Sequence, residues 1–525
     1  MKKQSFTLHL FIENLFVFPL KVGRTFLLAV LLLISTSQLF SQSLGISALG
    51  SPPNGSAGLD VNFSNKGLLI PRISLTGTTD ATTILTPALS LLVFNTATTS
   101  DVSPGFYYYN GSSWQRLATG AETSAGWSLT GNPDINPNIN FIGTTDYNPI
   151  NFRVNNEKAG TINPDGPLFL GYQAGNNNSG FSNTGLGHMA LKANTTGDGN
   201  LAVGGGALQK NTTGGANTGI GASALYANTT GQYNTAAGFN SLAGNITGES
   251  NSAVGYNALA SNTSGKNNIA IGTNSLQNNL TSDNNIAIGN DALQTNGGHD
   301  NIALGFESLR ANSTGNFNSA AGSQALYTSI TGDQNTAFGA RSLYNNTEGG
   351  YNTASGSFSL YTNTTGNENV AVGSHALFLN TAGNYNVANG TNALLNNTVG
   401  CDNTAIGYQA LTSNTTAEGN TAVGYQSLKS NATGTYNTAT GTSSLKNNTT
   451  GEHNTANGVA ALVANTTGHD NTAAGFWSLY TNETGNENTA FGVGALSSIT
   501  AADGNTAVGV RALNTETSGN YNTAT

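Results

Sequence analysis

The side chains that most often carry catalysis or bind metals are dispersed in this 525-residue sequence. Five of the six histidines lie in a 17-residue repeat that fills the second part of the chain, at different phases of that repeat: His188, His299, His375, His453 and His469. Stacking the repeats would therefore not bring three histidines together, as a metal or catalytic centre requires. We predict no catalytic, metal-ligating or cofactor-binding residues, and no enzymatic activity.

A set of acidic residues does share one phase, eleven residues after the central glycine of the repeat: Asp198, Glu249, Asp283, Asp333, Glu418 and Glu452. Such an edge could bind Ca²⁺ weakly, but neutral residues interrupt it, and the glycine-rich nonapeptide of calcium rolls is absent. The glycines also lack the spacing of dinucleotide-binding or Walker loops. We interpret the acidic residues as parts of solvated turns.

Charge and cysteine content exclude further classes of protein. Charged residues make up 8% of the chain, and the net charge of −9 leaves no basic patch, so nucleic acid is not an expected partner. Cys401 is the single cysteine, which excludes an intramolecular disulfide framework and a thiolate metal cluster. We interpret Cys401 as an incidental substitution, and the many Asn-x-Thr triplets as turn chemistry rather than glycosylation sites.

The repeat is defined by a marker glycine. Twenty marker glycines run from Gly187 to Gly509, in steps of 17 residues with a single step of 16 between Gly289 and Gly305, and a degenerate first copy at Gly171 brings the number to 21. In the 20 units from Gly187 onward, Asn always lies four residues before the marker, Ala or Ser three after it, and Leu four after it. The chain is organised as an array.

Each unit predicts a short strand followed by turns. The second residue before the marker is Ala in 18 of 20 units and alternates with Thr, Ser or aliphatic residues, a period of two that is typical of strands. The marker interrupts this alternation, which suggests a bend or bulge. Gly lies ten residues after the marker in 16 of 20 units, at a turn where a positive φ could be needed, and the shortened unit loses its residue there, at Asn296–Gly298.

Units of this length favour one coil of a β-solenoid, because helical repeats need about 30 residues or more. We therefore predict an all-β protein, a parallel β-solenoid of about 21 coils of 17 residues over residues 166–525, with ladders of Leu, Ala and Asn. Each coil offers about one Leu, one or two Ala and one aliphatic residue for burial. The free energy gained by burying these few side chains hardly balances the conformational entropy cost of ordering the coil, about 1.5 kcal/mol per residue. This imbalance favours burial of a second face against other chains.

The N-terminus is typical of an exported protein. Lys21 and Arg24 precede an apolar run over residues 26–34, followed by small or polar residues, so we predict a signal peptide over residues 1–41. An N-terminal membrane anchor is the alternative. The first 20 residues are unusual for a signal peptide, and translation that begins near Leu20 would remove them.

Two segments without the 17-residue period precede the array. Residues 42–120 predict a small β-rich module with strands at 67–70, 91–94 and 106–109 and a hairpin at Asn110-Gly111. Its expected core residues are Phe94, Phe106, Tyr108 and Trp114. Residues 121–165 predict a β-rich connector that contains Trp127 and a strand at 150–154, and that ends at a turn over 163–167.

Two parts of the chain resemble known families. The motifs at 268–272 and 403–411 resemble the head repeats of YadA-like trimeric autotransporter adhesins, a resemblance that covers about residues 168–525. Residues 67–72, 91–96, 104–114 and 141–146 look like the leader module of secreted tail-fibre-like proteins from Gram-negative bacteria. The resemblance implies a left-handed β-roll in a homotrimer, which forms a cell-surface fibre or adhesin head used for attachment.

The chain departs from both families after the array. No heptad stalk, membrane-anchoring strands or C-terminal chaperone follows, and the sequence stops at residues 522–525, within a unit. We expect a chain truncated in mid-repeat, with an anchorless protein as the alternative. We expect export to the cell surface or the exterior, and a host, matrix or cell-surface glycan or protein as the receptor.

Two other functions stay open. A monomeric solenoid could bind carbohydrate, or less plausibly ice, through a flat Thr or aromatic ladder. The two variable residues after the marker carry aromatic rings in several units: Phe239, Tyr256, Phe306, Tyr408, Tyr425, Phe476 and Trp477. These variable residues are expected to face outward, and any recognition is expected there or at the tip of the fibre.

Overall fold

The computed structural model describes residues 44–48, 50–117, 136 and 141–525, so the predicted signal peptide and Trp127 lie outside the described part. The chain divides into two compact units, 1–142 and 143–525, which are treated separately below. All the regular elements among the described residues are strands. The described residues contain no helix with the length and hydropathy needed to cross a bilayer.

The N-terminal unit contains two small sheets. Strands β1 (Leu44–Ser47) and β2 (Leu59–Asn62) pair in parallel. The second sheet has the order β3-β4-β5-β6 and consists of β3 (Arg72–Ile73), β4 (Leu92–Asn95), β5 (Gly105–Tyr109) and β6 (Trp114–Arg116). β3 and β4 are parallel, and the other two pairs are antiparallel. The strands predicted near 91–94 and 106–109 and the hairpin after Tyr109 are confirmed.

Two expectations for this unit are wrong. Residues 67–70 form no strand, and the short strand β3 begins only after Pro71. Of the four expected core residues, Trp114 is fully buried, but Phe94 is only partly buried, and Phe106 and Tyr108 are exposed. The core instead contains Val93 and Tyr107, which point to the opposite face of the sheet because side chains alternate along a strand.

The second unit begins with a hairpin. β7 (Ile150–Val154) pairs antiparallel with β8 (Glu157–Ile162), which pairs antiparallel with β9 (Leu168–Leu170). The turn predicted at 163–167 joins β8 to β9, where Asn163 N donates to Pro167 O. The hairpin therefore continues the sheet of the array.

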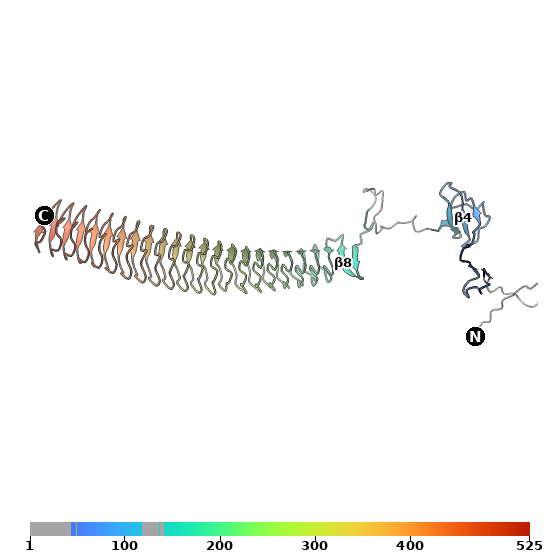
Figure 1. The fold of residues 1–525 in the computed structure, drawn as a ribbon, viewed down its shortest axis with the longest axis horizontal. Helices are drawn as coiled ribbons and strands as arrows, with labels where there is room; N and C mark the ends of the chain where they lie inside the picture. Colours follow the sequence, from blue (N-terminus) through green and yellow to red (C-terminus); the bar gives the residue numbers. More distant parts are fainter. Residues whose placement is uncertain (1–43, 49, 118–135, 137–140) are drawn as a thin grey trace, which may run out of the picture. The chain divides into compact units, whose positions relative to one another are not determined.

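From β9 onward every pair is parallel, as the solenoid prediction requires. Figure 1 shows the strands stacked along one side of this unit, each followed by a loop that returns to the next strand. The twenty-one further strands are β10 (Thr184–Leu186), β11 (Leu201–Val203), β12 (Thr218–Ile220), β13 (Thr235–Ala237), β14 (Ser252–Val254), β15 (Ile269–Ile271), β16 (Ile286–Ile288), β17 (Ile302–Leu304), β18 (Ser319–Ala321), β19 (Thr336–Phe338), β20 (Thr353–Ser355), β21 (Val370–Val372), β22 (Val387–Asn389), β23 (Thr404–Ile406), β24 (Thr421–Val423), β25 (Thr438–Thr440), β26 (Thr455–Asn457), β27 (Thr472–Ala474), β28 (Thr489–Phe491), β29 (Thr506–Val508) and β30 (Thr523–Ala524).

The core of the solenoid is a pair of apolar ladders. The central strand residue, usually Ala, is fully buried in nearly every coil, and so is the Leu four residues after the marker. Register is constant, so that Ala270 lies opposite Ala287, and it survives the shortened unit, where Ile286 pairs with Ile302. The missing residue falls in an irregular loop near Gly297, which confirms the predicted place of the deletion.

Two ladders of buried asparagine line the turns. In the first, four residues before the marker, Asn335 donates its backbone N–H and its Nδ2 to Asn318 Oδ1 at 3.0 and 3.1 Å, and Nδ2 also reaches Gly349 O at 2.8 Å. In the second, seven residues after the marker, Asn363 Nδ2 donates to Asn346 Oδ1 at 2.7 Å and to Gly366 O at 2.9 Å. Side chains of the first ladder thus bond to buried backbone groups, and those of the second ladder join a carbonyl of their own coil to the asparagine of a neighbouring coil.

The marker glycines are required by both conformation and space. From Gly187 to Gly509 their φ angles lie between 119° and 147°, a region that L-residues rarely adopt. A Cβ at Gly390 would lie 2.4 Å from the carbonyl oxygen of Gly407. The glycines ten after the marker differ from our expectation, because they have no positive φ. A Cβ at Gly366 would instead overlap Asn363 Oδ1 at 2.4 Å and Gly383 O at 2.5 Å.

The leucines of the ladder adopt the left-handed backbone conformation, with positive φ. All twenty leucines of the ladder have φ between 47° and 53°, although Leu disfavours this region. The conformation turns the chain so that Leu points into the core one residue after a buried Ala or Ser. Burial of each Leu in the stack compensates for the local strain.

Candidate binding surface

Three residues of each coil, the first, second and fifth after the marker, lie on the outside of the turn that follows the strand and are here called the corner positions. They follow the strand within a tight turn, and the ring of Trp477, at the second of these positions, is 49% exposed. The aromatic residues that the sequence placed at the first position are also exposed. The prediction that these side chains face outward is confirmed.

The longest aromatic ladder lies at the fifth position, outside the two variable positions at which the sequence predicts recognition. Tyr327, Tyr344, Tyr361 and Phe378 occupy four consecutive coils, with ring centroids 5.0, 5.2 and 5.2 Å apart and interplanar angles of 3°, 17° and 8°. The signal was present as four aromatic residues at a spacing of 17. At the second position Phe358 and His375 stack beside them, with centroids 5.3 Å apart.

Arginines extend this aromatic patch. Arg310 Nη1 donates to Tyr327 OH at 2.6 Å and its guanidinium lies 5.7 Å from the ring centroid. The hydrogen bond to Tyr327 raises the pKa of the Arg310 guanidinium, while burial raises the pKa of the Tyr344 hydroxyl. Arg341 lies 5.7 Å from the ring centroid of Phe358. The patch therefore combines stacked rings with cations held against ring faces.

The stacking restricts what this patch can bind. Tyr344 has a ring on each side, so its two faces are covered, and the side chain is half-buried. A sugar that stacks on an aromatic residue needs a free ring face. The ladder thus offers edges and hydroxyl groups, rather than a platform of ring faces.

A second outward surface is the strand face, formed by the first and third residues before each marker. Ile271 and Ile288 are each 41% exposed, although they flank a fully buried Ala. In three consecutive coils both positions are aliphatic: Ile269, Ile271, Ile286, Ile288, Ile302 and Leu304. This contiguous apolar stripe on a regular sheet is the kind of surface that packs against another protein surface.

The C-terminal coils carry threonine on the same face. Eight consecutive strands, β23 to β30, begin with Thr. The other strand-face position varies among Ile, Val, Thr, Asn, Ala and Phe in the same coils. A single regular file of hydroxyls beside irregular side chains does not form the flat two-dimensional ladder that ice binding would need.

The acidic residues eleven after the marker accept hydrogen bonds from backbone groups of the turns. Asp198 Oδ1 accepts the backbone N–H of Phe181 at 2.7 Å, and Asp283 Oδ1 accepts that of Lys266 at 2.7 Å. At the same position in other coils Asn384 Oδ1 and Cys401 Sγ accept equivalent backbone groups, at 2.7 and 3.3 Å. Neutral and acidic residues thus make the same bond, which favours a structural role for both.

Two of the histidines approach one carboxylate. His469 Nδ1 lies 2.8 Å from Asp470 Oδ2, and His453 Nδ1 lies 3.7 Å from Asp470 Oδ1. His188, His299 and His375 lie in distant coils. Within the described residues, no three side chains of His, Cys, Asp or Glu are arranged to hold a metal ion.

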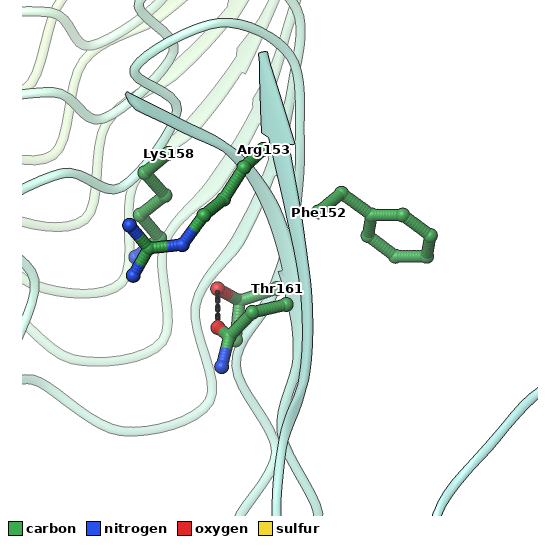
Figure 2. A pocket seen from close by; sticks show the side chains of 5 residues that line it. Phe152, Arg153, Lys158 and Thr161 are labelled. Carbon is green, nitrogen blue, oxygen red and sulfur yellow. Dashed lines mark hydrogen bonds between the residues drawn. The ribbon is translucent and has the colours of Figure 1, made fainter. Parts of the chain in front are cut away.

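The hollow beside the first hairpin belongs to the cap of the solenoid. It measures about 340 Å³, and Figure 2 shows Arg153 and Lys158 on one side of the hairpin with Phe152 directed to the other. Arg153 Nη1 donates to Asn156 O at 3.1 Å, and Lys158 Nζ donates to Gly175 O at 2.8 Å. Burial lowers the pKa of Lys158, and the side chains of Arg153 and Lys158 both donate to main-chain carbonyl groups.

Comparison with known proteins bears on the N-terminal unit. Residues 45–132 match the family model of the phage tail-like trimerisation region. This match supports the resemblance of the N-terminal module to tail-fibre-like proteins and covers only a small part of the chain. Neither characterised proteins nor solved structures gave a match.

Proposed function

We propose that this chain forms a homotrimeric fibre, exported from a Gram-negative cell, that projects from the cell surface and mediates attachment. The observation that carries the proposal is the unbroken parallel register from β9 to β30 in a chain whose N-terminal unit matches a trimerisation region. At about 4.8 Å per coil, such an array is a spacer of roughly 100 Å. Its role is structural and not catalytic.

The strand face supports side-by-side packing of three solenoids. The thin apolar core of each coil consists of one Leu and one or two small residues. The exposed aliphatic stripe around Ile271 and Ile288 offers the additional apolar surface that three copies would bury. This arrangement corresponds to the head of YadA-like adhesins, which the repeats resemble.

The corner positions are the proposed attachment surface. They vary from coil to coil, while the buried Asn, Gly and Leu are constant, so a receptor can be recognised without loss of stacking. The aromatic patch from Tyr327 to Phe378 is the largest such feature, and its edges and hydroxyls suit a protein or the polar rim of a glycan. A monomeric carbohydrate-binding solenoid is the second candidate, favoured by the exposed ring of Trp477.

Light scattering of the purified full chain tests the proposal. A trimer has three times the mass of the purified single chain, whereas a mass of one chain would overturn the fibre and favour the monomeric solenoid. Antibodies against the solenoid should label intact cells that express the chain, and particles coated with the protein should adhere to target cells. Absence of labelling would contradict surface exposure, and absence of adhesion would contradict attachment.

A further inference from the structure

The four-stranded sheet of the N-terminal unit has one buried face and one open face. The buried face carries Val93, Tyr107 and the adjoining Trp114. On the other face Phe94 lies opposite Phe106 in register, and their rings meet edge to face with centroids 5.1 Å apart. Large aromatic side chains on a solvated sheet face indicate a surface that is buried in an assembly.

An extended segment borders this open face. Leu68 and Leu69 are 60% and 74% exposed. The backbone N–H groups of Leu68, Leu69 and Ile70 donate no hydrogen bond to any residue in the described part of the chain. The segment has the sequence of a strand but pairs with no strand among the described residues.

The segment and the sheet enclose a groove of about 370 Å³. Its lining consists of Leu68, Leu69, Ile70, Phe94, Thr96 and Phe106, with Arg72 as the charged residue. A predominantly apolar groove beside unpaired backbone donors fits an apolar polypeptide segment better than a sugar or an ion. The occupant should therefore be protein.

We propose that the open face and the segment 68–70 form the subunit contact of the trimer, and that the occupant is the same face of two further copies of this chain. The family match supports this occupant, because residues 45–132, which match the model of a trimerisation region, include the whole groove. In the assembly Phe94, Phe106 and Leu69 are buried around the three-fold axis. The inference rests on the trimer of the proposed function and specifies where its chains meet.

Hydrogen–deuterium exchange of the full chain, combined with light scattering, tests the contact. Residues 84–86 are an internal control, because they also make no backbone hydrogen bond and Leu85 is 78% exposed, yet they lie outside the groove. We expect the amides of 68–70 to exchange at least about tenfold more slowly than those of 84–86. The variant Phe106→Ser should abolish this difference while β4 and β5 stay protected, whereas Leu85→Ser should leave it unchanged.

The outcomes separate this inference from the proposed function. A trimer in which residues 68–70 exchange as fast as residues 84–86 would overturn the contact and leave the trimeric fibre standing. A monomeric mass would overturn both. Because Phe94 and Phe106 contribute to the fold of the sheet, the variant Leu68→Ser/Leu69→Ser, which changes two exposed side chains, provides a second test. Loss of its exchange protection, with the Trp114 core intact, supports the contact.

Discussion

The side-chain oxygen of Asn312 has no hydrogen-bond partner among the described residues, because the next coil places Ser329 where most coils have an asparagine. The hydroxyl of Ser329 is also buried without a partner. Beyond the gap, Asn346 Nδ2 keeps its bond to Gly349 O at 2.8 Å but lacks the bond to a preceding asparagine. One substitution thus interrupts the second asparagine ladder on both sides.

The variant Ser329→Asn should repair this gap. Its amide can donate to Asn312 Oδ1 and accept from Asn346 Nδ2, so we expect a stabilisation of about 1 kcal/mol. The midpoint of denaturant unfolding measures the change. Ser329→Ala is the control, since it removes the unpaired hydroxyl without rebuilding the ladder. An asparagine variant no more stable than the alanine variant would contradict the account.

Substitution of a marker glycine should be far more harmful than substitution of a glycine at the first corner position. At Gly390 an alanine would combine a φ of 147° with a Cβ 2.4 Å from Gly407 O, so we expect a loss of at least about 2 kcal/mol. At Gly205 an added Cβ meets nothing within 4 Å, and Gly205→Ala should change stability by less than about 0.5 kcal/mol. Equal losses in thermal unfolding of the two variants would show that space is not decisive.

At the N-terminal end of the core, a large side chain at Phe169 is accommodated by the absence of a side chain at Gly185. Phe169 is fully buried, and Gly185 stands where most coils have alanine, so that a Cβ there would lie 2.7 Å from the Phe169 ring. Gly185→Ala should destabilise the protein by about 1–3 kcal/mol through overpacking. The double variant with Phe169→Leu should recover at least about 1 kcal/mol of that loss. Strict additivity of the two single changes in unfolding experiments would contradict the contact.

Introducing negative charge on the strand face should weaken association of the three chains without preventing the single chain from folding. Ile271→Asp with Ile288→Asp places carboxylates on half-exposed positions, so the isolated chain still folds. In a packed trimer those carboxylates would be buried without partners. We expect the dissociation constant to rise at least about tenfold, or about 1.4 kcal/mol. Light scattering over a dilution series measures it, with Tyr425→Asp as the control. An unchanged trimer would remove the strand face from the interface.

Acid should destabilise the N-terminal unit through Asp80. Burial raises the pKa of this carboxyl, but hydrogen bonds from Thr83, Thr76 and Thr82 outweigh burial and hold its pKa well below the ordinary value of 3.8. The carboxylate thus contributes stability that is complete above the unfolded pKa, near 4, and is lost as pH falls from there toward the folded pKa. Trp114 fluorescence during unfolding at pH 7 and pH 3 measures this loss, since Trp114 Nε1 donates to Asp80 O at 2.8 Å.

The variant Asp80→Asn is the comparison for that experiment. It should be less stable than the parent at pH 7, and its stability should change less between pH 7 and pH 3. A parent protein and a variant with the same pH dependence would exclude Asp80 as the titrating group.

The sequence was sufficient for the solenoid because its constraints recur. In each unit a central alanine alternates with Thr, Ser or aliphatic residues, and Leu lies at a fixed offset from the marker, so the sequence predicts buried ladders. The deletion near Gly297 predicts a turn. The left-handed conformation of every ladder Leu was not predictable, since it arises from stacking and runs against the preference of the residue. The role of the glycines ten after the marker was also misjudged, because close approach of successive coils, rather than φ, requires them.

The N-terminal unit was harder to read for a different reason. The run Phe106–Tyr109 is aromatic at every position, so alternation gives no sign of which face is buried. The core contains Tyr107, whereas the expected core residues Phe106 and Tyr108 lie on the opposite face of the sheet. The segment 67–70 has strand composition, yet no strand in the described part of the chain pairs with it. The aromatic patch from Tyr327 to Phe378 could not be predicted from the repeat pattern, because most coils carry non-aromatic residues at the fifth position.

The constant parallel register has a mechanical consequence. The hydrogen bonds between successive strands run along the axis of the array, and each coil touches only its two neighbours. A load applied to the two ends of the chain is therefore borne by one layer of bonds at a time. Each coil that detaches releases 17 residues, about 60 Å of extended chain, in place of a rise of about 4.8 Å. The array should lengthen in uniform steps under tension and so act as an extensible tether.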